Sequence, residues 1–216
     1  MAVATGVVDV VSYLGLGRVF TANMTGNLVL LGISGGAGRG RSALLSALAV
    51  AGFAGGAMAG ARFVDRAGSP AAAWPPRVAI SLGVESLLLA AFEVGWLLCH
   101  AHPEGAALSM LIITSGVAMG LQSAATRRLA GSAVSTTYVT GMLTALMASL
   151  ADGRRGPSEP RRAAAVLVAV AVGALVGAVL LSRLPLLTPT VSAGILGVVT
   201  IIAAGRSRAG RGPAAV

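Results

Sequence analysis

Lysine is absent from this 216-residue sequence, and charged residues of any kind make up only 11% of it. Soluble domains usually carry about 25% charged residues. A soluble fold that is 56% hydrophobic would therefore lack the polar surface needed to cover its core. The scarcity of charge excludes an ordinary soluble domain.

Cysteine and aromatic residues are also scarce. Cys99 is the only cysteine, so an intrachain disulfide is excluded. Aromatic residues make up 4% of the chain and do not alternate with a basic face, which excludes the usual surface of a nucleic-acid-binding module. The first residues lack the basic region of a cleavable signal peptide, so we expect the apolar start to stay as a membrane segment.

Motifs for catalysis and metal binding are missing as well. The sequence contains no nucleotide-binding loop, HExxH or GxSxG motif, and we therefore expect no enzyme activity and no cofactor. One short group of potential metal ligands consists of Cys99, His100, His102 and Glu104. Its spacing matches neither common zinc pattern, so we expect no metal site there.

Long apolar runs are what the sequence does contain, and the mean hydropathy is +0.86. Several of the runs approach the roughly 20 residues that a helix needs to cross a bilayer. This pattern predicts an all-α polytopic membrane protein. The eight runs are residues 2–16, 19–34, 42–63, 78–99, 106–124, 134–151, 163–182 and 186–204.

A polar string that contains Thr-Gly occurs twice, at residues 19–31 and 134–146. The copies share Val, Thr, Thr-Gly, Leu and Leu in register, 115 positions apart. A GxxxG face follows each copy, at residues 56–60 and 173–177, and such faces let helix backbones approach closely. These matches predict that the chain is duplicated.

We expect a single transmembrane domain over residues 1–204, made of one repeat at 1–99 and a second at 106–204. The remaining residues, 205–216, are expected to form a basic, unstructured cytoplasmic tail. Each repeat would contain one broken or short Thr-Gly segment.

Arginine positions distinguish two topologies. If all eight runs cross the membrane, the arginines divide nine against seven. If the two Thr-Gly segments enter and return without crossing, the arginines divide twelve against four. The positive-inside rule favours the second arrangement. The sequence therefore favours six crossings, inverted repeats and two cytoplasmic termini over eight crossings with parallel repeats.

The Thr-Gly strings are the predicted place of function. Gly26 and Gly141 allow backbone conformations closed to other residues, and the preceding Thr25 and Thr140 can cap a helix that starts there. Discontinuous helices of this kind build substrate sites in many transporters, although Thr and Gly also serve simply to pack helices. Two matched strings favour a pocket. The predicted donors and acceptors are Asn23, Asn27, Gln122, Thr136, Thr137 and Tyr138.

Acidic residues inside apolar runs are the second signal. Asp9 lies in the middle of the first run, where a charge costs about 2.5–3.5 kcal/mol. It would serve either as a proton, cation or substrate contact, or as an acceptor for backbone N–H groups of the neighbouring broken segment. Glu85 lies deep in the fourth run and is a further pathway candidate, whereas Glu93 is near the end of that run and is expected at the interface.

The sequence resembles a known family. The resemblance is carried by residues 6–11, 19–20, 23–27, 118–124 and 136–141 and extends over nearly the whole chain. These segments are similar to the YoaK family, uncharacterised bacterial integral membrane proteins with a domain of unknown function, number 1275. The resemblance implies a location in the bacterial plasma membrane and no established activity.

Two functional hypotheses follow. The first is a small secondary permease or channel-like carrier for an unidentified small solute, with a homodimer formed through the GxxxG faces. The alternative is a non-transporting accessory or assembly protein that uses the same polar strings for packing. A water-accessible cavity that reaches Asp9 and both strings would favour the first, and a fully packed centre would favour the second.

Overall fold

The computed structural model describes residues 1–65, 76–130, 139–151 and 159–209, and within these residues every regular element is a helix. Five helices are long and apolar enough to cross a membrane, which confirms the all-α membrane fold. The five are α3 (Gly40–Asp65), α4 (Pro76–Leu98), α5 (Gly105–Ala130), α7 (Glu159–Arg183) and α8 (Thr188–Ala209). Three shorter helices are α1 (Ala2–Gly15), α2 (Met24–Gly36) and α6 (Val139–Ala151).

The outer faces of the long helices are apolar. Leu87 on α4, Leu175 on α7 and Ile201 on α8 are 72%, 65% and 73% exposed. A protein surrounded by water rarely leaves large apolar patches of this kind uncovered. The outward-facing leucines and isoleucines therefore match a hydrocarbon environment, as the composition predicts.

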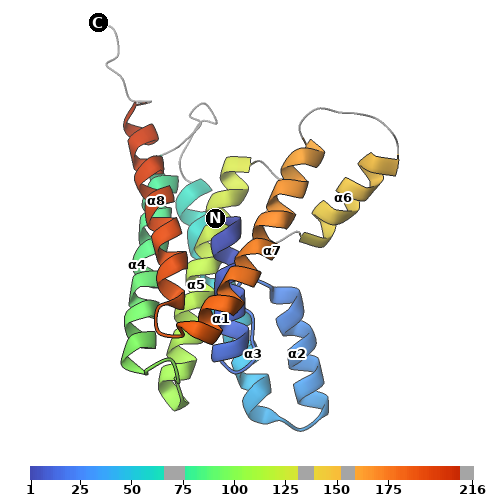
Figure 1. The fold of residues 1–216 in the computed structure, drawn as a ribbon, viewed down its shortest axis with the longest axis vertical. Coiled ribbons are helices and arrows are strands. Elements are labelled where there is room, and N and C mark those ends of the chain that lie inside the picture. The colour runs from blue at the N-terminus through green and yellow to red at the C-terminus, as the bar shows by residue number, and fades with distance from the viewer. Residues whose placement is uncertain (66–75, 131–138, 152–158, 210–216) are drawn as a thin grey trace, which may run out of the picture.

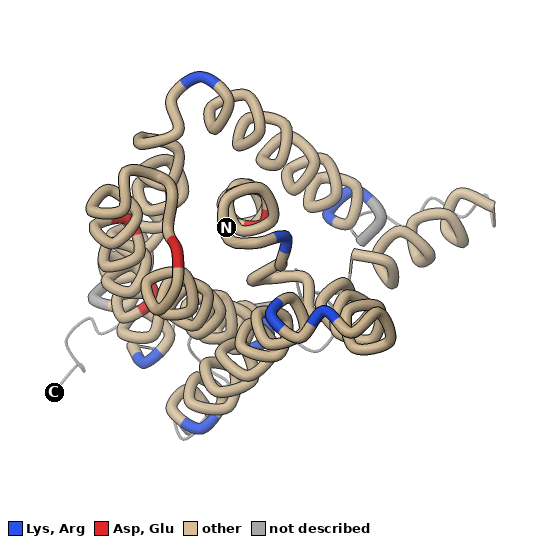
Figure 2. Tube along the Cα trace, turned by 90° about the horizontal axis from the view of Figure 1, so that it is seen from below, with Lys and Arg blue, Asp and Glu red and all other residues tan. Residues whose placement is uncertain are grey.

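The helices form one bundle around α1. The long helices run roughly parallel to one another, α2 lies in the lower half of the view and α6 in the upper half (Figure 1). Seen from below, the helix that carries the N-terminus lies inside a ring of the other helices, and acidic and basic residues occupy few places on the trace (Figure 2). The main contacts join α3 with α5, α1 with α7, α4 with α5 and α4 with α8.

Glycines let two of these helix pairs approach until their backbones touch. A Cβ atom at Gly56 on α3 would clash with the backbone of Val117 on α5, and one at Gly120 would clash with the backbone of α3. The α1–α7 pair has the same design, because Gly6 and Gly173 each face the other helix's backbone. The predicted close approach at both GxxxG faces is therefore confirmed.

The same contacts correct one expectation. Residues 56–60 and 173–177 pack against α5 and α1 inside the chain, so these faces cannot also join two copies in a homodimer. A dimer would have to use another surface.

Two boundaries differ from those predicted. The second apolar run was expected to begin at residue 19, but α2 begins at Met24, because residues 19–23 are held in a non-helical conformation described below. At the other end, α8 continues to Ala209, so the helix extends past residue 204 into the segment expected to be a tail.

Adjacent glycines on α3 provide a test of the packing. Gly56→Ala should destabilise the protein by about 1–3 kcal/mol, because the added methyl group meets backbone that cannot move aside. Gly55→Ala is the matched control, since no atom lies within 4 Å of a Cβ at that position. It should leave the thermal midpoint of the purified protein unchanged or raise it slightly, because alanine favours a helix. Equal effects of the two substitutions would contradict the described α3–α5 contact.

Candidate functional site

The segment between α1 and α2, residues 16–23, is the break in the helical structure that the first Thr-Gly string predicts. Gly17 and Arg18 adopt positive φ angles of 77° and 64°, and the chain turns back there at the end of α1. Asn23 then caps α2, and its side-chain oxygen accepts a hydrogen bond from the Gly26 nitrogen at 3.3 Å.

This geometry corrects the predicted caps. Thr25 lies inside the first turn of α2 and is exposed, because Asn23 already occupies the capping position with a side chain well suited to it. Thr140 likewise lies inside α6, which begins at Val139. Gly26 remains important for another reason: a Cβ there would crowd the Phe20 ring.

Asp9 on α1 holds the broken segment. Its carboxylate accepts hydrogen bonds from the backbone nitrogens of Thr21 at 3.1 Å and Ala22 at 2.8 Å. Of the two predicted roles for Asp9, the structure therefore contains the acceptor for unpaired backbone N–H groups. A role for Asp9 in a transport pathway stays a prediction.

Asn27 on α2 holds the same segment from the other side. Its side-chain oxygen accepts a hydrogen bond from the Phe20 nitrogen at 2.9 Å, and its amide nitrogen donates to the Phe20 carbonyl oxygen. The side chain is fully buried. Asn27 thus acts as a peptide-like partner for Phe20, a backbone position that no helix or strand could satisfy.

A chain of hydroxyl groups completes the arrangement. The Ser115 hydroxyl on α5 donates to the Thr21 hydroxyl at 2.9 Å, the Thr21 hydroxyl donates to Ser12 at 3.4 Å, and Ser12 donates to the Asp9 carbonyl oxygen at 3.1 Å. All three hydroxyl-bearing side chains are buried. The hydroxyl groups thus link the broken segment to α1 and α5 through side chains.

The second Thr-Gly string is described only in part. Thr136, Thr137 and Tyr138 lie outside the described residues. Thr140 and Gly141 are exposed in the first turn of α6, where the Thr144 hydroxyl donates to the Thr140 carbonyl oxygen at 3.0 Å. Within the described part of the chain, Asp9, Asn23 and Asn27 therefore gather around residues 20–26, and Thr140 and Gly141 are on a separate helix.

Glu85 and Gln122 make up a second buried polar group. Glu85 on α4 is 1% exposed and Gln122 on α5 is 2% exposed. Both carboxylate oxygens of Glu85, the Nε2 of Gln122 and the Ser81 hydroxyl are buried without a hydrogen-bond partner in the protein. A buried polar group without a partner costs about 1–3 kcal/mol, and a charged group costs more.

The register of α4 and α5 brings these residues to one level. Leu82 shares a core cluster with Ala125, and Leu89 shares another with Ala118. Glu85 follows Leu82 by three residues on α4, and Gln122 precedes Ala125 by three on α5. Since α4 and α5 are joined by a short turn and run in opposite directions (Figure 1), this register puts Glu85 and Gln122 at the same level of the two helices.

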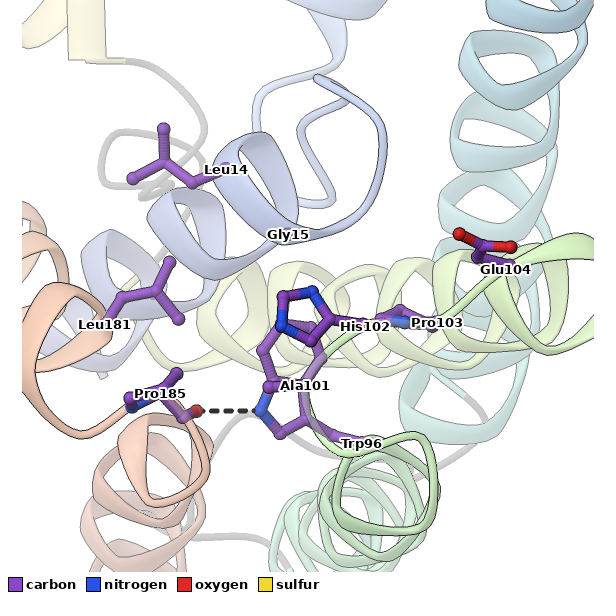
Figure 3. A pocket seen from close by; sticks show the side chains of 9 residues that line it. All are labelled: Leu14, Gly15, Trp96, Ala101, His102, Pro103, Glu104, Leu181 and Pro185. Carbon is purple, nitrogen blue, oxygen red and sulfur yellow. Dashed lines mark hydrogen bonds between the residues drawn. The ribbon is translucent and has the colours of Figure 1, made fainter.

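A cavity of about 290 Å³ lies at another place, where the ends of α1, α4 and α7 meet. Trp96 closes one wall, and its indole nitrogen donates to the Pro185 carbonyl oxygen at 2.8 Å (Figure 3). His102 and Glu104 from the α4–α5 turn contribute its ionisable groups. None of the predicted pathway residues lines this cavity, and the described residues contain no group of three or more metal-ligating side chains.

Sequence reasoning missed the hydroxyl groups. Thr21 belongs to the first Thr-Gly string but was not singled out as a donor or acceptor. Ser12, Ser81 and Ser115 carry no motif, because serine occurs throughout apolar helices and commonly bonds to the backbone of its own helix. Their position in the middle of apolar runs was the one available signal. It does not identify a partner, since Ser115 and Thr21 are 94 positions apart.

Substitutions at Asp9 test its role in holding the broken segment. Asp9→Ala leaves two buried N–H groups without an acceptor and should lower stability by about 1–3 kcal/mol for each. Asp9→Asn keeps a carbonyl oxygen in place and should cost clearly less. Thermal midpoints of the purified proteins measure both effects. Equal midpoints for wild type and Asp9→Ala would contradict the hydrogen bonds.

Comparison with known proteins agrees with this membrane architecture. A family model described as "Protein of unknown function (DUF1275)" matches residues 1–202. The UPF0700 transmembrane protein YoaK of Bacillus subtilis (strain 168) is 34% identical over 147 residues, which are 68% of this chain and 63% of that relative, less than two thirds of its length. No solved structure matches the chain. The chain is therefore a multi-pass membrane protein that belongs to the YoaK family, DUF1275.

Proposed function

We propose that this protein is a small secondary permease or channel-like carrier, and not an enzyme, built from two inverted repeats in the bacterial plasma membrane. The observation that carries the proposal is the contact pattern of the helices. If α1 to α4 are exchanged with α5 to α8 in order, each main contact becomes another observed contact. The α3–α5 contact becomes α7–α1, α4–α5 becomes α8–α1, and α2–α3 becomes α6–α7.

The glycine contacts support the same exchange at the level of single residues. Gly120 faces Phe53 and Ala57, and Gly6 faces Val170 and Ala174. Gly120 on α5 lies 114 positions after Gly6 on α1. The residues that they face are related by a second offset, because Val170 and Ala174 on α7 lie 117 positions after Phe53 and Ala57 on α3. The glycines of α3 and α7 follow the same two offsets. Gly56 faces Val117 and Gly173 faces Val3, so the α3 and α7 residues differ by 117 positions and the α1 and α5 residues by 114.

The contact between α4 and α8 also fits a twofold relation. The hydroxyl groups of Ser86 and Thr200 are 2.9 Å apart, and these residues are separated by 114 positions. Each residue is then the counterpart of the other, as expected for a pair on the axis that relates two repeats. Inverted repeats related by an axis in the membrane plane are common in secondary transporters, and their sites lie near that axis.

The described arginines support an inverted topology with six crossings. Eight described arginines are at or near helix ends at the top of the view, namely Arg62, Arg77, Arg127, Arg128, Arg161, Arg162, Arg206 and Arg208. Four are at or near ends at the bottom, namely Arg18, Arg39, Arg41 and Arg183 (Figure 1). Five of the crossings would be the long helices and the sixth would be α1. The positive-inside rule then assigns the arginine-rich end, with both termini, to the cytoplasm.

A carrier is favoured by what lies inside the bundle. The segment before α2 breaks the helical structure next to the half-buried carboxylate of Asp9, and α4 and α5 hold a second carboxylate and an amide between them. Polar and ionisable residues inside a membrane protein usually serve transport or proton transfer.

A specific observation also favours the alternative, a non-transporting accessory or assembly protein. The polar side chains around the broken segment form hydrogen bonds within the protein, as seen for Asp9, Asn27 and Thr21. Residues that serve only to hold a broken segment would look the same.

The topology can be tested by cysteine labelling. Gly36→Cys at the end of α2 and Ala151→Cys at the end of α6 should be labelled from opposite sides of the membrane in a Cys99→Ser background, because α2 and α6 would enter from opposite sides. An impermeant maleimide applied to intact cells and to inverted vesicles measures the side. Labelling of both positions from one side would refute the inverted arrangement.

Transport can be tested after a ligand screen. We expect at least one solute from a panel of amino acids, sugars, nucleobases and small anions to raise the thermal midpoint of the purified protein. The same radiolabelled solute should then exchange into proteoliposomes. Glu85→Gln should reduce this exchange at least tenfold, and Glu93→Gln on the same helix is the matched control. Folded protein that exchanges none of the panel would favour the accessory role.

A further inference from the structure

The buried polar residues between α4 and α5 are unusual because they leave both donors and acceptors unused. The acceptors are the two carboxylate oxygens of Glu85, and the donor is the Nε2 of Gln122. Ser81, one helical turn before Glu85, adds a hydroxyl group that can donate or accept a hydrogen bond. The three side chains are 1–3% exposed, so bulk water does not complete their hydrogen bonds.

The orientation of Gln122 makes it a donor toward this place. Its Oε1 already accepts from the Thr5 hydroxyl of α1 at 3.2 Å, which leaves the amide N–H groups free. A metal cation would instead require oxygen ligands, about 6–8 for calcium. An N–H donor at the level of a carboxylate suits a site in which the carboxyl group itself gains and loses a proton.

A proton is the ligand that these three side chains can accommodate. In the structure these three side chains are not hydrogen-bonded to one another. When Glu85 is ionised, a change of rotamer would let Gln122 and Ser81 each donate a hydrogen bond to one carboxylate oxygen. When Glu85 is protonated, its O–H can donate to the Ser81 oxygen while the other oxygen still accepts from Gln122. Serine permits this exchange because its hydroxyl group both donates and accepts.

We propose that Glu85, Ser81 and Gln122 form a proton-binding site in the middle of the bundle. One proton from water forms an O–H bond on the Glu85 carboxylate and leaves again as a hydrated proton, and no electrons are transferred. The role of this site depends on the proposed permease function, because the bound proton would be the ion coupled to transport of the solute. Ser86, the next residue on α4, makes the contact with Thr200 of α8, so the site lies at the same level of α4 as that contact.

The charged surroundings of Glu85 are few. Met1 at the start of α1 packs against the cluster that contains Leu82, one turn before Glu85, so its amino group is a nearby charge. On α8, the Thr200 hydroxyl donates to the Leu82 carbonyl oxygen, and on α5 Gln122 lies at the level of Glu85; neither side chain carries a charge. Asp9, the half-buried acid of α1, accepts hydrogen bonds from the backbone of Thr21 and Ala22.

Infrared spectroscopy of the full chain in lipid bilayers tests the proposal directly. A carbonyl stretching band from a protonated carboxyl group should appear and disappear reversibly as the pH of the buffer is changed. Glu85→Gln should remove this titrating band, and Glu93→Gln should retain it. A band that is lost in neither variant, or that does not respond to pH, would overturn the proposal.

A second variant keeps the test decisive if Glu85→Gln fails to fold. Gln122→Leu removes a donor to the ionised carboxylate, so the titration should move to higher pH by about one unit or more. An unchanged midpoint would overturn the role of Gln122. A protein extended before Met1 moves the amino group away, and the Glu85 band should still titrate. Loss of the titration in that protein would assign it to the Met1–Glu85 pair instead.

The two proposals fail separately. A Glu85 band that titrates in a protein that exchanges no solute would support the proton site and reject the permease. Solute exchange with a Glu85 band that never titrates would support the permease and reject the proton site.

Discussion

The peptide groups of residues 16–23 impose the main constraint on this structure. Outside a helix these groups cannot bond to one another in sequence, so those that are buried need partners from other parts of the bundle. The carboxylate of Asp9 and the amide of Asn27 supply partners from inside the bundle, and the Thr21 hydroxyl accepts a hydrogen bond from Ser115. Because Ser115 on α5 joins the same set, the break in one helix fixes the position of its neighbours, and α1 must lie in the centre.

The glycine contacts act on a different scale. Gly56 and Gly120 bring α3 and α5 together over their backbones, and Gly6 and Gly173 do the same for α1 and α7. Dispersion contacts of this closeness replace the hydrophobic effect, which does not favour one apolar helix over lipid. Hydrogen bonds therefore hold the irregular segment, and the close fit at the glycines determines which helices pack together.

The sequence predicted the helices better than it predicted their polar partners. Eight apolar runs indicated eight helices, because length and hydropathy are local properties. The start of α2 was misplaced, because it depends on Asp9, which bonds to Thr21 and Ala22 from 12 and 13 positions away. Glu85 stood out as a buried acid, but the position of Gln122 opposite it follows from the register of α4 against α5, which no motif encodes. The position of Ser115 within an apolar run did not identify Thr21 as its partner, because the two residues are 94 positions apart.

The glycine contacts also divide the molecule mechanically. Helices whose backbones touch cannot slide past each other without losing this close contact. We therefore expect α3 with α5, and α1 with α7, to behave as two stiff blocks, each with one helix from each half of the chain. Between the blocks, α4 meets α8, where the side-chain link is a hydroxyl pair, Ser86 with Thr200. A movement of one block relative to the other would change the contact between α4 and α8. It would also change the surroundings of Glu85, which precedes Ser86 by one residue.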